Sequence, residues 1–190
     1  MPQYICLQEA ESTNTRMKAM ASQLPSGSVI YTPCQTAGRG QKDNTWESEP
    51  GKNLAFSFLL KNPNLAANEQ FYISEACSLA VLDTLSAFAD GFAIKWPNDI
   101  YHGDSKICGI LIENALFDKR IGYSIIGIGI NINQERFVSD APNPISLKNI
   151  TGRDYDLQEL LTNVCQRIED LCDFSQATPT SLAATHSRFM

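Results

Sequence analysis

Residues 95–113 read K-W-P-N-D-I-Y-H-G-D-S-K-I-C-G-I-L-I-E, and this stretch, with the apolar residues after it, decides the fold that we expect. The stretches 106–117 and 121–132 are both apolar and rich in isoleucine, and the charged residues 118–120 separate them. Long apolar stretches with β-branched residues on either side of a short polar turn are typical of two paired strands. The sequence therefore predicts a buried β-hairpin over 106–132.

Charged side chains stand at the ends of the predicted strands. Residues 92–94 predict a further short strand, which Pro97 ends because proline has no backbone N–H to donate. Lys95 and Asp99 are therefore expected at a strand's end, and Lys106 opens the hairpin without an evident acidic partner nearby in sequence. One interpretation is that a phosphate or carboxylate ligand meets the Lys106 ammonium. The other is a lysine whose amine reaches water at the strand's edge.

The composition fits one globular domain spanning residues 1–190. The chain is 43% hydrophobic and 19% charged, and its net charge of -6 argues against broad binding to nucleic acid or anionic membranes. It opens without a targeting sequence and has no membrane-spanning apolar stretch, so we expect a cytoplasmic protein. The six cysteines form no C-x-x-C pair and there are two histidines, which disfavours a zinc site or a histidine-dependent triad.

Shorter patterns predict the remaining elements. Apolar stretches predict strands at 4–7, 29–32 and 53–60. Helical spacing of apolar residues predicts helices at 12–24, 68–88 and 156–174. The proline-containing stretch 134–150 is expected to be an irregular connection, and Thr178-Pro179 to open a last helix.

Two polar stretches allow a structural or a ligand-binding interpretation. Residues 11–15, E-S-T-N-T, can cap the helix that they precede, or can hold the polar head of a ligand. Residues 34–54 form a glycine-containing basic loop, which can be an ordinary surface loop or a flap that a ligand orders. In that loop, glycines let backbone N–H groups approach an anion, and Trp46 offers a flat face to a ring.

Five ordered blocks together resemble the catalytic domain of the biotin protein ligases. The blocks are S-T-N-T at 12–15, Q-T-A-G-R-G at 35–40 with Trp46 beyond it, K-W-P-N-D at 95–99, K-I-C-G-I-L-I-E at 106–113, and G-I-G-I-N at 127–131. The resemblance implies an α/β (α+β) fold, with a mixed sheet flanked by helices as in class II aminoacyl-tRNA synthetases. It also implies a single catalytic domain, without an N-terminal winged helix or the usual C-terminal SH3-like domain.

The resemblance implies a two-step activity as a biotin-[acetyl-CoA-carboxylase] ligase. Biotin and ATP with Mg²⁺ would give biotinyl-5'-AMP, and a lysine of a carboxylase's biotin carrier domain would then take the biotinyl group. Neither nucleic acid nor a membrane is an expected partner, and a homodimer is left open. Two alternatives remain: a lipoate or octanoate ligase or transferase of the same fold, and a non-catalytic biotin-binding module.

The resemblance also assigns the site residues. Catalytic roles fall to Lys106, Arg39 and Asp99, and Asp99 would also hold the metal. Biotin would contact Ser12, Thr13, Asn14, Gln35, Gly38, Arg39, Gly40, Gln41, Lys106, Gly109 and Leu111. ATP would contact Lys42, Asn44, Trp46, Lys95, Asn98 and Asn131. This chain departs from the family's common pattern at Gln41 and Asn44, where arginine is usual, so its loop carries less positive charge.

Overall fold

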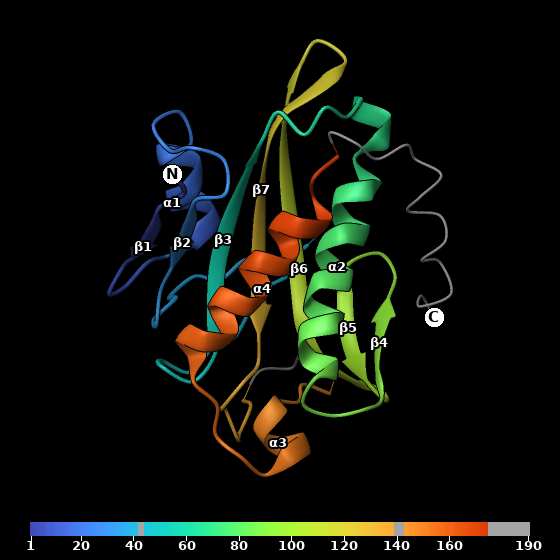
Figure 1. Cartoon of the computed structure of the whole chain (residues 1–190). Coiled ribbons are helices and arrows are strands. Elements are labelled where there is room, and N and C mark those ends of the chain that lie inside the picture. The colour runs from blue at the N-terminus through green and yellow to red at the C-terminus, as the bar shows by residue number, and fades with distance from the viewer. Residues whose placement is uncertain (42–43, 139–142, 175–190) are drawn as a thin grey trace.

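A seven-stranded sheet forms the centre of the computed structural model, which describes residues 1–41, 44–138 and 143–174 (Figure 1). Its strands are β1 (Tyr4–Cys6), β2 (Val29–Tyr31), β3 (Leu54–Lys61), β4 (Phe92–Lys95), β5 (Asp99–His102), β6 (Ser105–Phe117) and β7 (Arg120–Ile130). Their spatial order is β1-β2-β3-β7-β6-β5-β4, with β1 and β2 parallel and the other neighbours antiparallel. The predicted mixed sheet and the β6–β7 hairpin are therefore confirmed.

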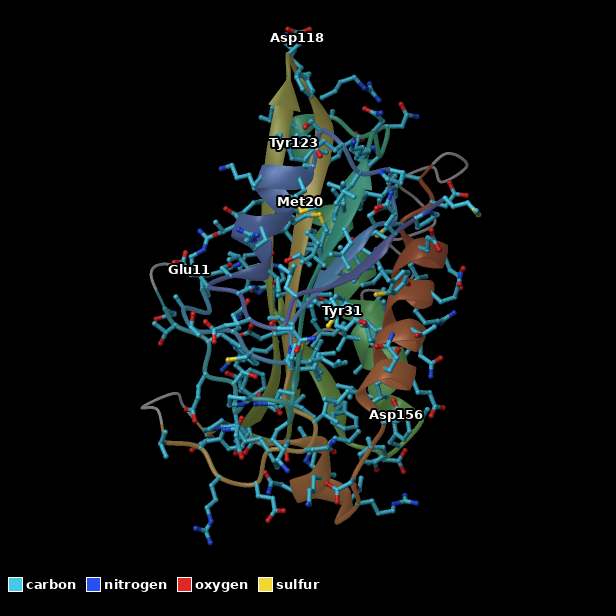
Figure 2. All side chains as sticks on the ribbon, turned by 90° about the vertical axis from the view of Figure 1, so that its left-hand side faces the viewer. Glu11, Met20, Tyr31, Asp118, Tyr123 and Asp156 are labelled. Carbon is cyan, nitrogen blue, oxygen red and sulfur yellow. The ribbon has the colours of Figure 1, made fainter. Side chains whose placement is uncertain are left out.

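Different helices cover the two faces of the sheet. On one face lie α2 (Phe71–Ser86) and α4 (Leu157–Leu171), and on the other lies α1 (Thr13–Met20). Figure 2 shows Met20 of α1 and Asp156, which caps α4, on opposite sides of the sheet. Because strand side chains alternate between faces, β3 sends Phe56 and Phe58 toward α2 and α4 and sends Leu59 toward α1.

The sequence of α4 shows why this helix forms and where it packs. The Asp156 carboxylate accepts hydrogen bonds from the backbone N–H groups of Gln158 and Glu159, at 2.7 and 3.0 Å, which caps the first turn. Its buried residues recur at helical spacing and join the larger core: Leu160, Leu161, Val164, Cys165 and Ile168. Truncating one of the two leucines or Ile168 to alanine would cost about 2–5 kcal/mol.

The structure contains two short elements that the sequence did not predict, and several predicted boundaries differ from the observed ones. Residues 99–102 form β5, because the chain reverses directly after Pro97 and pairs back onto β4, with Lys95 opposite Asp99. Residues 147–151 form a helix, α3 (Leu147–Thr151), inside the stretch expected to be irregular; it is too short for periodicity to reveal. α1 ends at Met20, before the predicted 24.

The expected helix opening at Thr178-Pro179 lies outside the described residues. Within the described part of the chain, every helix falls short of the length and apolar character needed to cross a membrane.

Candidate active site

Glycines on the α1 face of the central hairpin form the floor of a cavity of about 200 Å³. In the β6–β7 register, Gly109 lies opposite Gly129 and Leu111 lies opposite Gly127. A Cβ atom on Gly127 would collide with the Asn14 side chain, and one on Gly129 would collide with the Trp46 indole. The missing side chains therefore let α1 and the loop before β3 approach the sheet closely.

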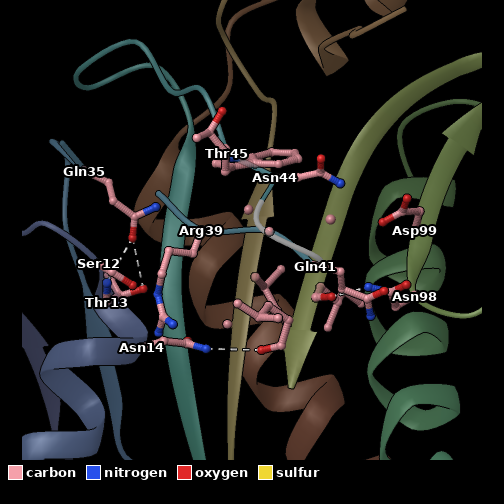
Figure 3. Close-up of a pocket in the computed structure, with 18 of the residues that line it drawn as sticks. Ser12, Thr13, Asn14, Gln35, Arg39, Gln41, Asn44, Thr45, Asn98 and Asp99 are labelled. Carbon is pink, nitrogen blue, oxygen red and sulfur yellow. Dashed lines mark hydrogen bonds between the residues drawn. The ribbon is translucent and has the colours of Figure 1, made fainter. Parts of the chain in front are cut away.

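Polar side chains from three elements form one end of the cavity. The Thr13 backbone N–H donates to Gln35 Oε1 at 2.9 Å (Figure 3). Ser57 Oγ donates to Asn14 Oδ1 at 2.6 Å. Asn14 Nδ2 donates to Glu113 Oε2 at 2.8 Å. Ser12 is the N-cap residue of α1, yet its side chain makes no capping hydrogen bond and lines the cavity. This end therefore presents fixed hydroxyl and amide groups to a polar ligand.

A lysine–carboxylate pair forms the other end. Lys106 Nζ lies 2.7 Å from Asp99 Oδ2, with 26% and 25% of the two side chains exposed. No acidic partner of Lys106 was evident nearby in sequence; the structure supplies the Asp99 carboxylate, seven residues earlier, because β5 carries it back alongside β6. The β5–β6 register shifts between Ile100 and Tyr101, beside this pair. In a regular strand, residues an odd number of positions apart face opposite sides of the sheet. A bulge changes the direction in which the following side chains point, and here Lys106 and Gly109 both line the cavity.

The described loop residues 35–41 and 44–53, which we call the flap, precede β3, and Trp46 of the flap covers the floor. The Trp46 N–H donates to the Gly38 carbonyl at 2.9 Å, and the Trp46 indole lies over Gly109 and Gly129. The centroid of its ring is 5.8 Å from Lys106 Nζ, and its Nε1 is buried without a hydrogen-bond partner among the described residues.

Arg39 of the flap reaches down into the cavity. Arg39 Nη2 pairs with Glu113 Oε2 at 3.1 Å, on the same oxygen that accepts from Asn14. The Arg39 side chain is 47% exposed, so this pair is reached by solvent and its net contribution is small, about 0.2–1 kcal/mol. A ligand carboxylate or phosphate can therefore recruit Arg39 at little cost.

The structure brings most of the predicted site residues together around this cavity. Those that line it are Ser12, Thr13, Asn14, Gln35, Arg39, Gly40, Gln41, Asn44, Trp46, Asn98, Asp99, Lys106, Gly109 and Leu111. Gly38 is buried within the flap, where a Cβ would meet Trp46 and Gln35, and does not line the cavity. Lys42 lies outside the described residues.

Two of the predicted nucleotide-contacting residues lie outside the cavity. Lys95 is exposed, with its Nζ 4.5 Å from the centroid of the Tyr101 ring. Asn131 is buried, and its Nδ2 donates to the Ile145 carbonyl at 3.2 Å while its Oδ1 has no partner among the described residues. Neither side chain lines the cavity as the structure stands.

Sequence reasoning missed several residues of the site. Thr45, Ile110, Gly127, Ile128 and Gly129 also line the cavity. Glu113 and Ser57 support its polar end without having been assigned a role. The alternating glycines of G-I-G-I at 127–130 could have indicated the floor, because both glycines fall on one face of a strand.

Cys108 lies beside the charged end, inside the K-I-C-G stretch, and is fully buried. Burial raises the pKa of its thiol, the nearby Asp99 charge raises it further, and Lys106 lowers it. The thiol therefore stays protonated near neutral pH and cannot act as a nucleophile.

These features define a class: an α/β domain with a cavity on one face of its sheet, between a polar end and an end that holds a lysine–carboxylate pair. The model of the "Biotin/lipoate A/B protein ligase family" matches residues 4–131. The chain belongs to this family.

Individual relatives agree with this assignment. The chain is 30% identical over 172 residues to the bifunctional ligase/repressor BirA of Bacillus spizizenii, which covers 86% of this chain and 52% of that protein. It is 30% identical over 162 residues to the biotin--[acetyl-CoA-carboxylase] ligase of Paracoccus denitrificans, covering 82% of this chain and 67% of that protein. The chain thus spans about half the length of the first of these relatives.

A solved structure shares the fold over the full chain. The biotin protein ligase from Aquifex aeolicus in complex with biotin and ATP superposes with a TM-score of 0.87 at 29% identity, covering 100% of this chain and 79% of that one. The predicted family and the predicted type of fold are confirmed.

Proposed function

We propose that this chain activates biotin with ATP to form biotinyl-5'-AMP and transfers the biotinyl group to a lysine of a biotin carrier domain of a carboxylase. The observation that carries the proposal is the polarity of the cavity. Hydroxyl and amide groups line one end, Lys106 lies beside Asp99 at the other, and the exposed Arg39 side chain reaches from the flap into the cavity, where a ligand anion can draw it away from Glu113. A ureido ring with a carboxylate-bearing chain matches this arrangement.

At the polar end, the groups suit a flat ring that both donates and accepts hydrogen bonds. The hydroxyls of Ser12 and Thr13 and the amides of Asn14 and Gln35 provide both kinds of partner. The bonds that tie Thr13 to Gln35 and Asn14 to Ser57 preorganise these groups before a ligand arrives. Between the two ends, the Gly109–Gly129 floor and the Trp46 indole that lies over it provide an apolar surface for the chain.

At the charged end, the biotin carboxylate attacks the α-phosphate of ATP and pyrophosphate leaves. Lys106 and Arg39 stabilise the negative charge on the reacting carboxylate and phosphate. Asp99 keeps the Lys106 ammonium oriented toward the cavity. In the second step, the amine of the carrier lysine attacks the biotinyl carbonyl, AMP leaves, and an amide bond replaces the mixed anhydride.

Magnesium would reach this site bound to the nucleotide phosphates. Among the described residues, no group of three or more His, Cys, Asp or Glu side chains is placed to hold a metal ion. Mg²⁺ commonly binds through one or two carboxylates and substrate phosphates, and Asp99 is the carboxylate that lines the cavity. The ion would neutralise phosphate charge, and Asp99 would contact it through the carboxylate that also pairs with Lys106.

The nucleotide would occupy the flap side of the cavity. A cavity of about 200 Å³ is smaller than the roughly 300–1,000 Å³ typical of small-molecule pockets, so the flap moves when the adenylate forms. Trp46 would cover the adenine, with Asn44 and Asn98 nearby on the cavity wall. Lys42, Lys95 and Asn131 would approach the phosphates and the nucleoside after this movement.

The proposal includes the cytoplasm as location, because the reaction consumes ATP, and a carrier domain as the protein partner. Nucleic acid and membrane are not partners in it, given the net charge of -6. A homodimer is compatible with it, because the flap and the cavity are formed within one chain.

The test is pyrophosphate release by the purified protein with ATP and magnesium, in the presence of biotin, lipoate or octanoate. Release that depends on biotin alone, followed by label transfer to a carrier-domain lysine, is the expected result. Release with lipoate or octanoate instead would identify the alternative ligase. Biotin binding without any pyrophosphate would identify a non-catalytic module and contradict the proposal.

A further inference from the structure

Gln134, which follows β7 and lies outside the cavity, uses every hydrogen-bonding position of its side-chain amide. Its Oε1 accepts from the Glu49 backbone N–H at 3.0 Å and from Asn53 Nδ2 at 2.5 Å. Its Nε2 donates to Glu47 Oε1 at 3.2 Å and to the Arg136 carbonyl at 2.8 Å. Gln134 is 1% exposed, so water does not substitute for these partners.

The neighbours fix the orientation of this amide. Asn53 Oδ1 accepts from the Ile132 N–H at 2.9 Å, which turns Asn53 Nδ2 toward Gln134. The Glu47 carboxylate and the Arg136 carbonyl only accept, so they must face the Gln134 NH₂ group. A buried network in which each polar atom has a partner holds one arrangement, because any other leaves a buried group unpaired.

Three of the four bonds of Gln134 reach the C-terminal half of the flap, directly after Trp46. The Trp46 backbone is held from the other side by its hydrogen bond to the Gly38 carbonyl. Its indole contacts the floor at Gly109 and Gly129 but finds no hydrogen-bond partner there among the described residues. The position of Trp46 is therefore set through the flap backbone.

Described residues farther along the chain after β7 form hydrogen bonds with the backbone of Lys106 on β6. The Lys106 N–H donates to the Asn143 carbonyl at 2.9 Å, and the Ile145 N–H donates to the Lys106 carbonyl at 3.0 Å. Asn131, three residues before Gln134, donates to the Ile145 carbonyl. The described residues that follow β7 thus make hydrogen bonds both to the flap and to the part of β6 that carries Lys106.

We infer that Gln134 is a positioning residue that holds Trp46 over the glycine floor beside Lys106, and so sets the affinity for the purine end of the nucleotide without touching either substrate. This inference rests on the proposed function. It predicts that losing the Gln134 amide weakens ATP binding and leaves biotin binding unchanged, because the bonds at the polar end of the cavity involve neither Gln134 nor the segment 47–53.

The test uses the intrinsic fluorescence of Trp46 to report how accessible its indole is. The chain has two tryptophans, so Trp96→Phe leaves Trp46 as the single emitter, and phenylalanine keeps a ring beside Phe71. In this background, Gln134→Ala should raise iodide quenching of Trp46 severalfold. By calorimetry it should raise the dissociation constant for ATP about tenfold while that for biotin changes less than twofold.

Asn133→Ala is the matched control. The Asn133 side chain also makes two hydrogen bonds, but with the Tyr155 backbone before α4 and not with the flap. It should lower the melting temperature without altering quenching or ATP affinity. Combining Glu47→Gln with Gln134→Glu restores a donor–acceptor pair with reversed polarity, and should recover part of the ATP affinity lost in Gln134→Glu alone.

Unchanged quenching in Gln134→Ala would overturn the inference, as would equal weakening of ATP and biotin binding, which a general loss of structure would cause. A quenching change as large in Asn133→Ala would overturn it too. Failure of the proposed function looks different: no pyrophosphate forms with biotin and ATP in the background protein, while the difference in Trp46 quenching and ATP binding persists and supports the positioning role.

Discussion

Replacing Lys106 with alanine should remove adenylate formation while leaving the fold intact. Lys106 Nζ lies 2.7 Å from Asp99 and lines the cavity, so the substitution deletes a cation at the reacting phosphate. Loss of one such donor in the transition state costs about 2.7–4 kcal/mol, or roughly 10²–10³ in rate. We therefore expect pyrophosphate release to fall by about this factor.

The effect on stability should be far smaller. About a quarter of each side chain in the Lys106–Asp99 pair is exposed, so Asp99 stays partly hydrated when its partner is lost. Exposed pairs contribute about 0.2–1 kcal/mol, and this partly buried pair should lie at or somewhat above the upper end of that range, which corresponds to a shift of a few degrees in the melting temperature. The backbone bonds of residue 106 to Asn143 and Ile145 do not depend on its side chain.

The assay compares Lys106→Ala with Arg167→Ala in single-turnover pyrophosphate release. Arg167 Nη2 also lies 2.7 Å from a carboxylate oxygen, that of Asp83, but this pair joins α4 to α2 on the face away from the cavity. Arg167→Ala should match the stability loss and keep the rate. A near wild-type rate in Lys106→Ala, or an equal loss in Arg167→Ala, would refute the reasoning.

Three further predictions follow from the flap and the buried thiols. Gln41→Arg should slow escape of biotinyl-5'-AMP up to about tenfold, because a charged donor to phosphate contributes about 1.5–3 kcal/mol and an amide only part of this; an unchanged off-rate would show that another group already closes the site. Trypsin cleavage after Arg39 should slow when biotin or the adenylate is bound, because a bound carboxylate or phosphate would hold the exposed Arg39 side chain; equal cleavage with and without ligand would contradict this. Unfolding free energy, measured by denaturant titration, should fall above about pH 8.5: burial raises the pKa of Cys165 to about 12 and also raises that of Cys108, so the folded state keeps protons that the unfolded thiols release. Each thiol should contribute up to about 1.4 kcal/mol per pH unit, a slope that Cys108→Ala with Cys165→Ala should reduce; an unreduced slope would assign it to other groups.

Long apolar and amphipathic stretches of the sequence predicted much of the fold. The hairpin over 106–132 appears as β6 and β7, and the amphipathic stretch 156–174 appears as α4. The hairpin has long apolar stretches on either side of a polar turn, and the helix has apolar residues at helical spacing along its whole length. β5 and α3 were missed because each spans only a few residues, where pairing or capping outweighs periodicity.

The sequence predicted most of the residues that form the site, but not which side chains contact one another. The motifs supplied most of the lining residues, yet the partner of Lys106 depends on a chain reversal and a bulge that no local pattern marks. Glu113, whose carboxylate bonds to Asn14 across 99 positions, and Gln134, whose amide bonds to the flap, are ordinary polar residues in the sequence. Their roles exist only once the sheet brings distant segments together.

The most direct test of the proposed activity is mass spectrometry of the small molecules formed when the purified protein is incubated with biotin, ATP and magnesium. The account predicts biotinyl-5'-AMP from the wild-type protein, little from Lys106→Ala, and no lipoyl adenylate when lipoate replaces biotin. Absence of biotinyl-5'-AMP from a folded, biotin-binding wild-type protein would contradict it.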